Sequence, residues 1–149
     1  MRRYLHVGCG PARHEDTPFA KEPGVWAETR LDIDKLAQPH ILGHMTDMKA
    51  AASGEYDALY SSHSVEHLYP HEVPVALAEF RRVLKPDGFA LITCPDLQSV
   101  CALVAQGNLD GTAYQSPGGP IAPIDIIFGY RKAMAAGNLF MAHRTGFTA

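Results

Sequence analysis

The apolar positions of this chain fall into short runs that alternate with stretches of helical spacing. Four apolar residues recur at spacings of four, three and four, which predicts a helix with one apolar face, stopped by the turn 85–88. They are Val73, Leu77, Phe80 and Leu84. The last apolar run is continuous, as is typical of a strand covered on both faces. The runs predict five strands, at residues 4–7, 25–32, 41–43, 56–62 and 89–94.

Two further helices are predicted after the last strand. Asp96 can cap the first, whose apolar face consists of Leu97, Val100, Cys101 and Val104. The second covers residues 124–136. Residues 108–123 are rich in glycine and proline, so we expect them to be irregular. Residues 13–24 are polar and contain two prolines, so any helix after the first strand is short or missing.

Strands that alternate with helical segments predict a parallel sheet in an α/β layer fold. Ligands of such sheets bind beyond the carboxyl ends of the strands. Four groups follow predicted strands in this way, so one ligand could touch all of them. They are the turn Gly8-Cys9-Gly10, Asp32, Asp47 and the segment Ser61–His63.

The chemistry of these groups suits a nucleoside. Glycines let backbone N–H groups approach a ligand closely. Asp32 lies 24 residues after Gly8, a spacing typical of a carboxylate that binds a ribose. Such a carboxylate accepts hydrogen bonds from both ribose hydroxyls. Asp47 could accept a bond from an adenine amino group, and the thioether of Met48 could lie on the ring.

Composition narrows the choice of partner and compartment. The 149 residues suffice for one domain with a core. No run approaches the ~18 apolar residues of a membrane span, and the start of the chain has no apolar signal segment, so we expect a cytoplasmic protein without membrane contact. The net charge of -3 argues against nucleic acid as a partner. Three cysteines do not form a disulfide framework.

Together these pieces resemble the class I S-adenosylmethionine-dependent methyltransferases, in particular the small bacterial type 11-like group. The resemblance implies a Rossmann-like three-layer sandwich with a mainly parallel sheet of order 3-2-1-4-5. It implies a single methyltransferase-like domain over residues 1–149, in which 108–147 covers the substrate. Because this single domain has no basic patch, we expect a small-molecule methyl acceptor. The matching segments are His6–Pro11, Leu31–Asp34, Met45–Met48, Tyr56–Leu59, Val65–Leu68 and Leu84–Phe89.

The resemblance also implies which residues bind S-adenosylmethionine. The glycine turn would pass close to the methionyl part of the cofactor. The end of the second strand would hold the ribose and pack against the adenine. The end of the third strand would hold the adenine edge, and the end of the fourth would lie near the methionyl amino group. In that order the residues are Gly8, Cys9 and Gly10; Asp32 and Ile33; Asp47 and Met48; Ser61 or Ser62.

The chain departs from the family pattern in two ways. His6 stands where many members carry an acidic residue that helps to bind the amino end of the cofactor. The sequence stops at Ala149, where the family continues with a helix and an antiparallel strand pair, so we expect that pair to be missing. The fifth strand would then be an edge of the sheet. Either residues 124–147 or a second copy of the chain could cover this edge, and we slightly favour the second copy.

A general base is needed only if the acceptor starts protonated. His63 and His67 follow the fourth strand and are the two catalytic candidates, and His143 is a third. We interpret Cys9 as a small residue rather than a reactive one, and Cys94 and Cys101 as core.

Three other functions are compatible with parts of the pattern. A nucleotide-linked oxidoreductase shares the glycine turn and the acidic strand end but lacks the third glycine of its fingerprint. A methyltransferase fold without activity would bind partners only. A metal-binding module could use His63, His67 and His71, which are spaced by four, but Pro70 interrupts that helix and we expect no metal.

Overall fold

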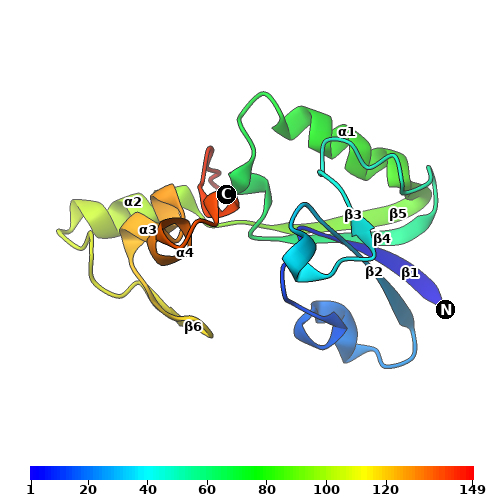
Figure 1. Ribbon diagram of the computed structural model, residues 1–149, viewed down its shortest axis with the longest axis horizontal. Coiled ribbons are helices and arrows are strands. Elements are labelled where there is room, and N and C mark those ends of the chain that lie inside the picture. The colour runs from blue at the N-terminus through cyan, green and yellow to red at the C-terminus, as the bar shows by residue number, and fades with distance from the viewer. The chain divides into compact units, whose positions relative to one another are not determined.

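Five parallel strands form one sheet in the order β3-β2-β1-β4-β5 (Figure 1). This computed structural model describes residues 1–149. The order predicted from the sequence is confirmed, and with it the Rossmann-like fold. The strands are β1 (Arg2–Val7), β2 (Trp26–Asp32), β3 (Ile41–Leu42), β4 (Tyr56–Ser62) and β5 (Leu84–Thr93).

The chain divides into two units. The sheet unit contains Met1–Ser64 and His71–Thr93, and the helical unit contains Val65–Pro70 and Cys94–Ala149. No helix in either unit has both the length and the apolar character needed to cross a bilayer.

In the sheet unit, helix α1 (Val73–Val83) lies over one face of the sheet, and two 3-10 turns lie over the other (Figure 1). These turns, His14–Asp16 and Pro18–Lys21, replace the long helix that commonly follows a glycine turn, as the sequence predicted. Phe19 anchors them, because its ring stacks on Tyr4 at 4.2 Å and meets the edge of Trp26 at 4.7 Å. A single buried aromatic residue thus substitutes for a helical face.

The apolar face of α1 differs from the predicted one. The buried residues are Ala76, Phe80 and Val83, while Leu77 is 44% exposed. The prediction was right for Phe80 and for the burial of Leu84, which is the first residue of β5, and wrong for Leu77, whose place toward the core is taken by the smaller Ala76.

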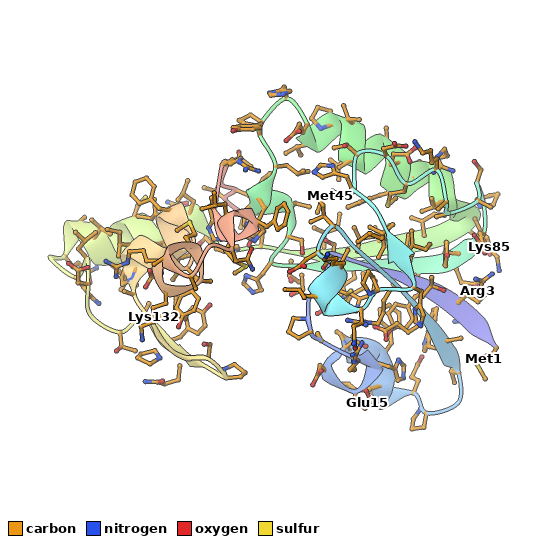
Figure 2. The ribbon with its side chains drawn as sticks, in the orientation of Figure 1. Met1, Arg3, Glu15, Met45, Lys85 and Lys132 are labelled. Atoms are coloured by element: carbon orange, nitrogen blue, oxygen red, sulfur yellow. The ribbon has the colours of Figure 1, made fainter.

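The first part of β5 forms a bulge against β4, at the amino ends of the strands. Residues 85–88 lie opposite the single residue Asp57, whose carboxylate accepts bonds from the Arg3 N–H (2.8 Å) and from Lys85 Nζ (2.6 Å). These bonds hold the pKa of Asp57 below its usual range. Arg3 and Lys85 lie at the same end of the sheet (Figure 2), which leaves the carboxyl ends for a ligand.

Strand β5 is less covered than its apolar sequence predicted. Phe89 is 50% exposed, and Ala90 is exposed as well. The expectation of cover on both faces was wrong, because β5 is the edge strand of the sheet. One ring face of Phe89 does pack within the unit, against Phe19 and Trp26.

The helical unit begins its main helix where the sequence predicted. Helix α2 (Leu97–Ala105) follows Asp96, whose side chain accepts a bond from the Gln98 N–H at 3.2 Å. Val100 is buried on this helix, but Cys101 is exposed, so its assignment to the core was wrong.

The rest of the helical unit is more ordered than predicted. A hairpin of β6 (Tyr114–Ser116) and β7 (Gly119–Ile121) occupies the region expected to be irregular. The single helix predicted over 124–136 is two helices, α3 (Pro123–Phe128) and α4 (Arg131–Ala135). Gly129 lies between them. A Cβ at this position would lie 2.9 Å from the Ala142 Cα, so the packing there requires glycine. The helical unit also contains the 3-10 turns Val65–His67 and Leu139–Met141. A further 3-10 turn, Lys35–Ala37, belongs to the sheet unit.

Candidate functional site

The glycine turn follows β1 directly and is attached to the end of β2. Gly8 and Gly10 have φ angles of 66° and 51°, in the left-handed region that glycine enters without steric cost. The N–H groups of Gly8 and Cys9 donate to the Leu31 carbonyl at 2.9 and 3.3 Å. The turn therefore lies at the carboxyl edge of the sheet, where a ligand is expected.

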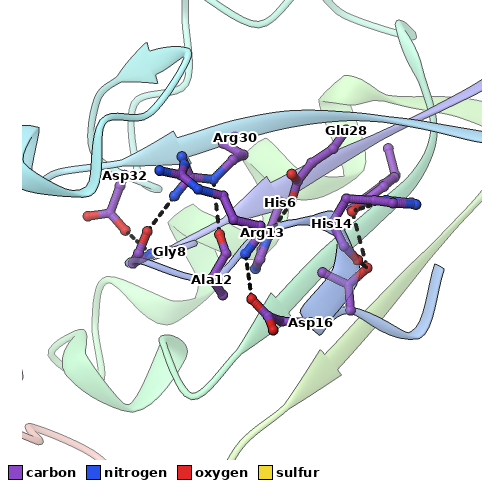
Figure 3. A network of polar contacts seen from close by, with 12 residues as sticks. His6, Gly8, Ala12, Arg13, His14, Asp16, Glu28, Arg30 and Asp32 are labelled. Atoms are coloured by element: carbon purple, nitrogen blue, oxygen red, sulfur yellow. Dashed lines mark hydrogen bonds and ion pairs between the residues drawn. The ribbon is translucent and has the colours of Figure 1, made fainter. Parts of the chain in front are cut away.

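Asp32 contacts the glycine turn through its carboxylate (Figure 3). Its Oδ2 accepts a bond from the Gly10 N–H at 2.7 Å, and its Oδ1 accepts one from the Asp34 N–H at 2.8 Å. Each carboxylate oxygen has a second lone pair, so both can still accept a bond from a ligand. The structure thus brings together two of the predicted groups, the turn and Asp32.

Arg30 is a buried residue of the site that the sequence did not reveal. Its side chain is 2% exposed, and its guanidinium donates to four backbone carbonyls, of which those of the glycine loop can be followed in Figure 3. Two belong to the glycine loop and two to the turn after β2, so Arg30 ties these loops together. The acceptors are Gly10 O (2.5 Å), Ala12 O (3.1 Å), Ala37 O (3.0 Å) and Gln38 O (3.0 Å).

A signal for Arg30 was present in the sequence. Glu28, Arg30 and Asp32 alternate along β2, so they share one face of the strand. Three charged residues on one face of a strand next to β1 indicate buried polar contacts rather than a solvated surface.

His6 makes a buried contact on the same face. Its Nδ1 lies 2.7 Å from Glu28 Oε1, and its ring lies 5.0 Å from that of Tyr60. His6 is therefore bound to a carboxylate of the neighbouring strand, at the position where the family pattern has an acidic residue.

Ser64 is a second residue that the sequence did not reveal. Its hydroxyl lies 3.1 Å from the carbonyls of Gly8 and Ser62, which joins the glycine turn to the end of β4. A Cβ on Gly8 would lie 2.6 Å from the Ser64 Cβ, whereas a Cβ on Gly10 would meet nothing within 4 Å. Gly8 is thus required by packing, and Gly10 borders open space that a ligand could fill.

The end of β4 carries three of the predicted residues. Ser61 is fully buried, and its Oγ has no hydrogen-bond partner in the structure. Ser62 is half-buried and accepts a bond from Thr93 Oγ1 at 2.8 Å. His63 is exposed and has a φ of 50°, which is uncommon for a residue other than glycine. Such an outlier at a strand end supports a hypothesis of function.

The two predicted residues of the loop after β3 lie in different surroundings, one in solvent and one in the core. Asp47 is exposed and pairs with Lys49 at 3.0 Å. Met48 is 1% exposed, and its N–H donates to Glu79 Oε2 at 2.7 Å. The thioether of Met48 is therefore part of the core, whereas Asp47 faces solvent. Ile33, by contrast, is 42% exposed at the end of β2.

Cys9 is buried in the turn, and burial raises the pKa of its thiol to about 12. The thiol stays protonated near neutral pH, so Cys9 is not a nucleophile. This agrees with its interpretation as a small residue.

The other histidine candidates belong to different units. His67 and His143 both lie in the helical unit, where their rings meet edge to face at 4.8 Å. His63 and His71 lie in the sheet unit. The three histidines spaced by four along the chain are thus divided between the units.

Comparison with solved structures supports the fold. An S-adenosylmethionine-dependent methyltransferase from Archaeoglobus fulgidus is 22% identical with a TM-score of 0.54, over 84% of this chain and 57% of that one. One from Leishmania major is 18% identical with a TM-score of 0.52, over 63% and 43%. The 1,6-didemethyltoxoflavin-N1-methyltransferase of Burkholderia thailandensis, solved with 1,6-didemethyltoxoflavin and S-adenosylhomocysteine, is 21% identical with a TM-score of 0.51, over 64% and 45%.

The chain spans about half the length of these three structures. No curated protein matches it. The sequence profile of the methyltransferase domain, however, matches residues 5–92, which is more than half of the chain. That region contains the glycine turn, Asp32 and the ends of β3 and β4. The chain belongs to the methyltransferase domain family.

Proposed function

We propose that this chain is an S-adenosylmethionine-dependent methyltransferase that acts on a small molecule. The observation that carries the proposal is the Asp32 carboxylate bound to the Gly10 N–H, on a turn where a Cβ at Gly10 would meet nothing. The carboxylate that would bind the ribose then lies beside the open position at Gly10, which would face the methionyl chain. The related Burkholderia enzyme was solved with S-adenosylhomocysteine.

The remaining residues fit the other parts of the cofactor. The exposed Ile33 offers an apolar surface for the adenine ring, and Asp47 offers an acceptor for its amino group. Ser62, with the buried Ser61 behind it, lies at the strand end expected near the methionyl amino group. Met48 makes no side-chain contact in this proposal, because its thioether is in the core.

The chain's own part in the chemistry is alignment. The sulfonium of the cofactor supplies an activated methyl group. Residues that hold the acceptor in line with it can contribute ~7–11 kcal/mol toward the barrier. If the acceptor needs deprotonation, His63 is the preferred base, because its strained backbone fixes it at the end of β4. His67 is the second candidate, with its Nδ1 bonded to the Ala142 carbonyl at 3.1 Å.

We place acceptor recognition in residues 108–147, which contain the β6-β7 hairpin, α3 and α4. A net charge of -3 favours a small molecule over nucleic acid. The three cysteines are free, which favours a reducing, cytoplasmic compartment. We also propose that the chain forms a homodimer through the free edge of β5.

One observation favours a second function, a methyltransferase fold that binds the cofactor or a partner without catalysis. His6 replaces the family's acidic residue and is paired with Glu28 instead. Transfer of a radiolabelled methyl group to any compound of a small-molecule extract would exclude this function.

Calorimetry with S-adenosylhomocysteine tests the proposed cofactor site. We expect saturable binding to the wild-type chain and at least tenfold weaker binding to Gly10→Ala. Gly54→Ala is the matched control, since Gly54 has a φ of 66° and a Cβ there also meets nothing within 4 Å. Both variants bear a similar backbone cost, about 1–2 kcal/mol. Absence of binding to the wild type, or equal effects of the two variants, would overturn the proposal.

A further inference from the structure

Three side chains with metal-binding atoms converge in the helical unit. They are Glu66, His67 and His143, and one ligand atom from each lies within 4.8 Å of the others. Glu66 is 1% exposed, and both histidines are half-buried. From this cluster we propose that the helical unit contains a binding site for a divalent transition-metal ion such as zinc.

Backbone hydrogen bonds hold the two parts of the cluster together. Glu66 and His67 lie on the 3-10 turn Val65–His67, and His143 lies near the end of the chain. The Glu66 carbonyl accepts bonds from the N–H groups of Arg144 (2.8 Å) and Thr145 (3.3 Å). The His67 carbonyl accepts one from Arg144 Nη1 at 3.0 Å. The two residues that follow His143 are thus fixed to the turn.

Each imidazole of the cluster is held at Nδ1 by a backbone carbonyl. His67 Nδ1 lies 3.1 Å from the Ala142 carbonyl, and His143 Nδ1 lies 2.6 Å from the Ile126 carbonyl. A carbonyl only accepts, so each Nδ1 is the donor of its bond. This leaves Nε2 as the atom of each ring that could bind a metal. Histidines that bind metals commonly donate their other ring N–H to a carbonyl in this way.

The set of donor atoms selects the class of ion. Two imidazole nitrogens and one carboxylate suit zinc, iron, cobalt, nickel or copper better than magnesium or calcium, which prefer oxygen ligands. Tetrahedral zinc with bonds of about 2.1 Å needs ligand atoms roughly 3.4 Å apart. A cation also lowers the cost of a buried carboxylate at Glu66.

Three protein ligands leave one position of a tetrahedral ion open. Glu66 and His143 also line a small pocket in the same unit. Its other walls include the apolar side chains of Leu97, Ile126 and Ile127 and the side chain of Thr145. The pocket is large enough for about one water molecule, which could supply the fourth ligand of the ion.

Zinc titration of chelator-treated protein, followed by calorimetry, tests the site without any methyl acceptor. We expect one zinc ion per chain, with at least tenfold weaker binding to Glu66→Gln and His143→Gln. His71→Gln is the control, because it belongs to the alternative set of histidines spaced by four. It should bind zinc within about twofold of the wild type, as expected for a residue outside the ligand set.

Cobalt absorption gives a second readout that does not depend on the buried Glu66 variant folding. The wild-type chain should show visible bands of a four- or five-coordinate cobalt site, and His143→Gln should shift or abolish them while its circular dichroism stays that of the wild type. The proposal is overturned if the wild type takes up no zinc or cobalt. It is also overturned if His71→Gln loses the ion while His143→Gln keeps it.

Discussion

Two charged residues of β2 hold opposite sides of the same glycine. Asp32 accepts the N–H of Gly10, and Arg30 donates to its carbonyl. In a fold with a long first helix, the first turn of that helix would fix this loop. Here β2 fixes it instead, because the segment after the turn forms only short 3-10 turns.

Replacing Arg30 tests this account. Arg30→Met removes the donor of four carbonyl bonds and leaves buried acceptors without a partner. We expect the free energy of unfolding to fall by about 2–4 kcal/mol. Urea unfolding at neutral pH measures it. Arg13→Met is the control, since Arg13 lies exposed in the same loop. Similar losses in both variants would contradict a special role for Arg30.

The three thiols should differ in reactivity. Cys101 is exposed, Cys94 is half-buried with its pKa raised by burial, and Cys9 is buried with a pKa of about 12. With a chromogenic disulfide reagent at pH 8, we expect Cys101 to react first and Cys9 only as the chain unfolds. The variant Cys101→Ser should lose the fast phase. A fast phase that survives in this variant would show that a second thiol is accessible.

At the scale of elements, α1 holds the loop that carries Asp47. Glu79 accepts bonds from the Met48 N–H (2.7 Å) and from Arg82 Nε (2.6 Å), and Arg82 donates to the carbonyls of Met48 and Ala51. The bond from Arg82 and the N–H of Met48 lower the pKa of Glu79 from its ordinary value of 4.5.

A lowered carboxyl pKa makes stability depend on pH in a definite direction. The unfolded chain binds a proton at Glu79 below about pH 4.5, while the folded chain resists it. The stabilisation is therefore complete above pH 4.5 and is lost as the pH falls through the folded pKa. Glu79→Gln should be less stable at pH 7 and lose less on acidification than the wild type, as measured by urea unfolding. Glu15→Gln, at an exposed carboxylate, should keep the wild-type slope.

Local patterns predicted the strands and the start of α2, because apolar spacing and helix caps are properties of neighbouring residues. The strand order was implied by the resemblance to the methyltransferase family. They failed where a partner distant in the sequence decides. Gly129 lies so close to Met141 and Ala142 that it has no room for a Cβ, and the burial of Ala76 rather than Leu77 depends on how α1 packs in the folded unit.

The same limit applies to the candidate site. The glycine turn and Asp32 could be predicted from their spacing along one chain segment. Arg30 and Ser64 could not, because their acceptors lie on loops that only the folded sheet brings to them. The sequence indicated buried polar contacts only through the alternating charges of β2, which include Arg30, and through the polar residues that follow β4, which include Ser64.

At the scale of the whole molecule, the two units differ in how far the family describes them. The profile match ends at residue 92, near the end of β5, so it covers nearly all of the sheet unit and little of the helical unit. The proposed cofactor residues are in the sheet unit, while the proposed metal site and acceptor-binding residues are in the helical unit. What distinguishes this chain from other family members should therefore be sought in the helical unit.

The open edge of the sheet predicts self-association. Strand β5 pairs with β4 on one side and with no strand on the other, and its Phe89 and Ala90 are exposed. Unpaired backbone groups on an apolar edge favour pairing with another strand. A second copy of the chain can pair there about a two-fold axis.

Light scattering over a range of concentrations should therefore detect a dimer. Ala90→Lys should shift the equilibrium toward the monomer, because a charge beside the edge opposes strand pairing. Ala105→Lys, at an exposed position of α2, should leave the equilibrium unchanged. A wild-type chain that stays monomeric at every concentration, or a dimer that both lysines weaken equally, would place the interface elsewhere or exclude it.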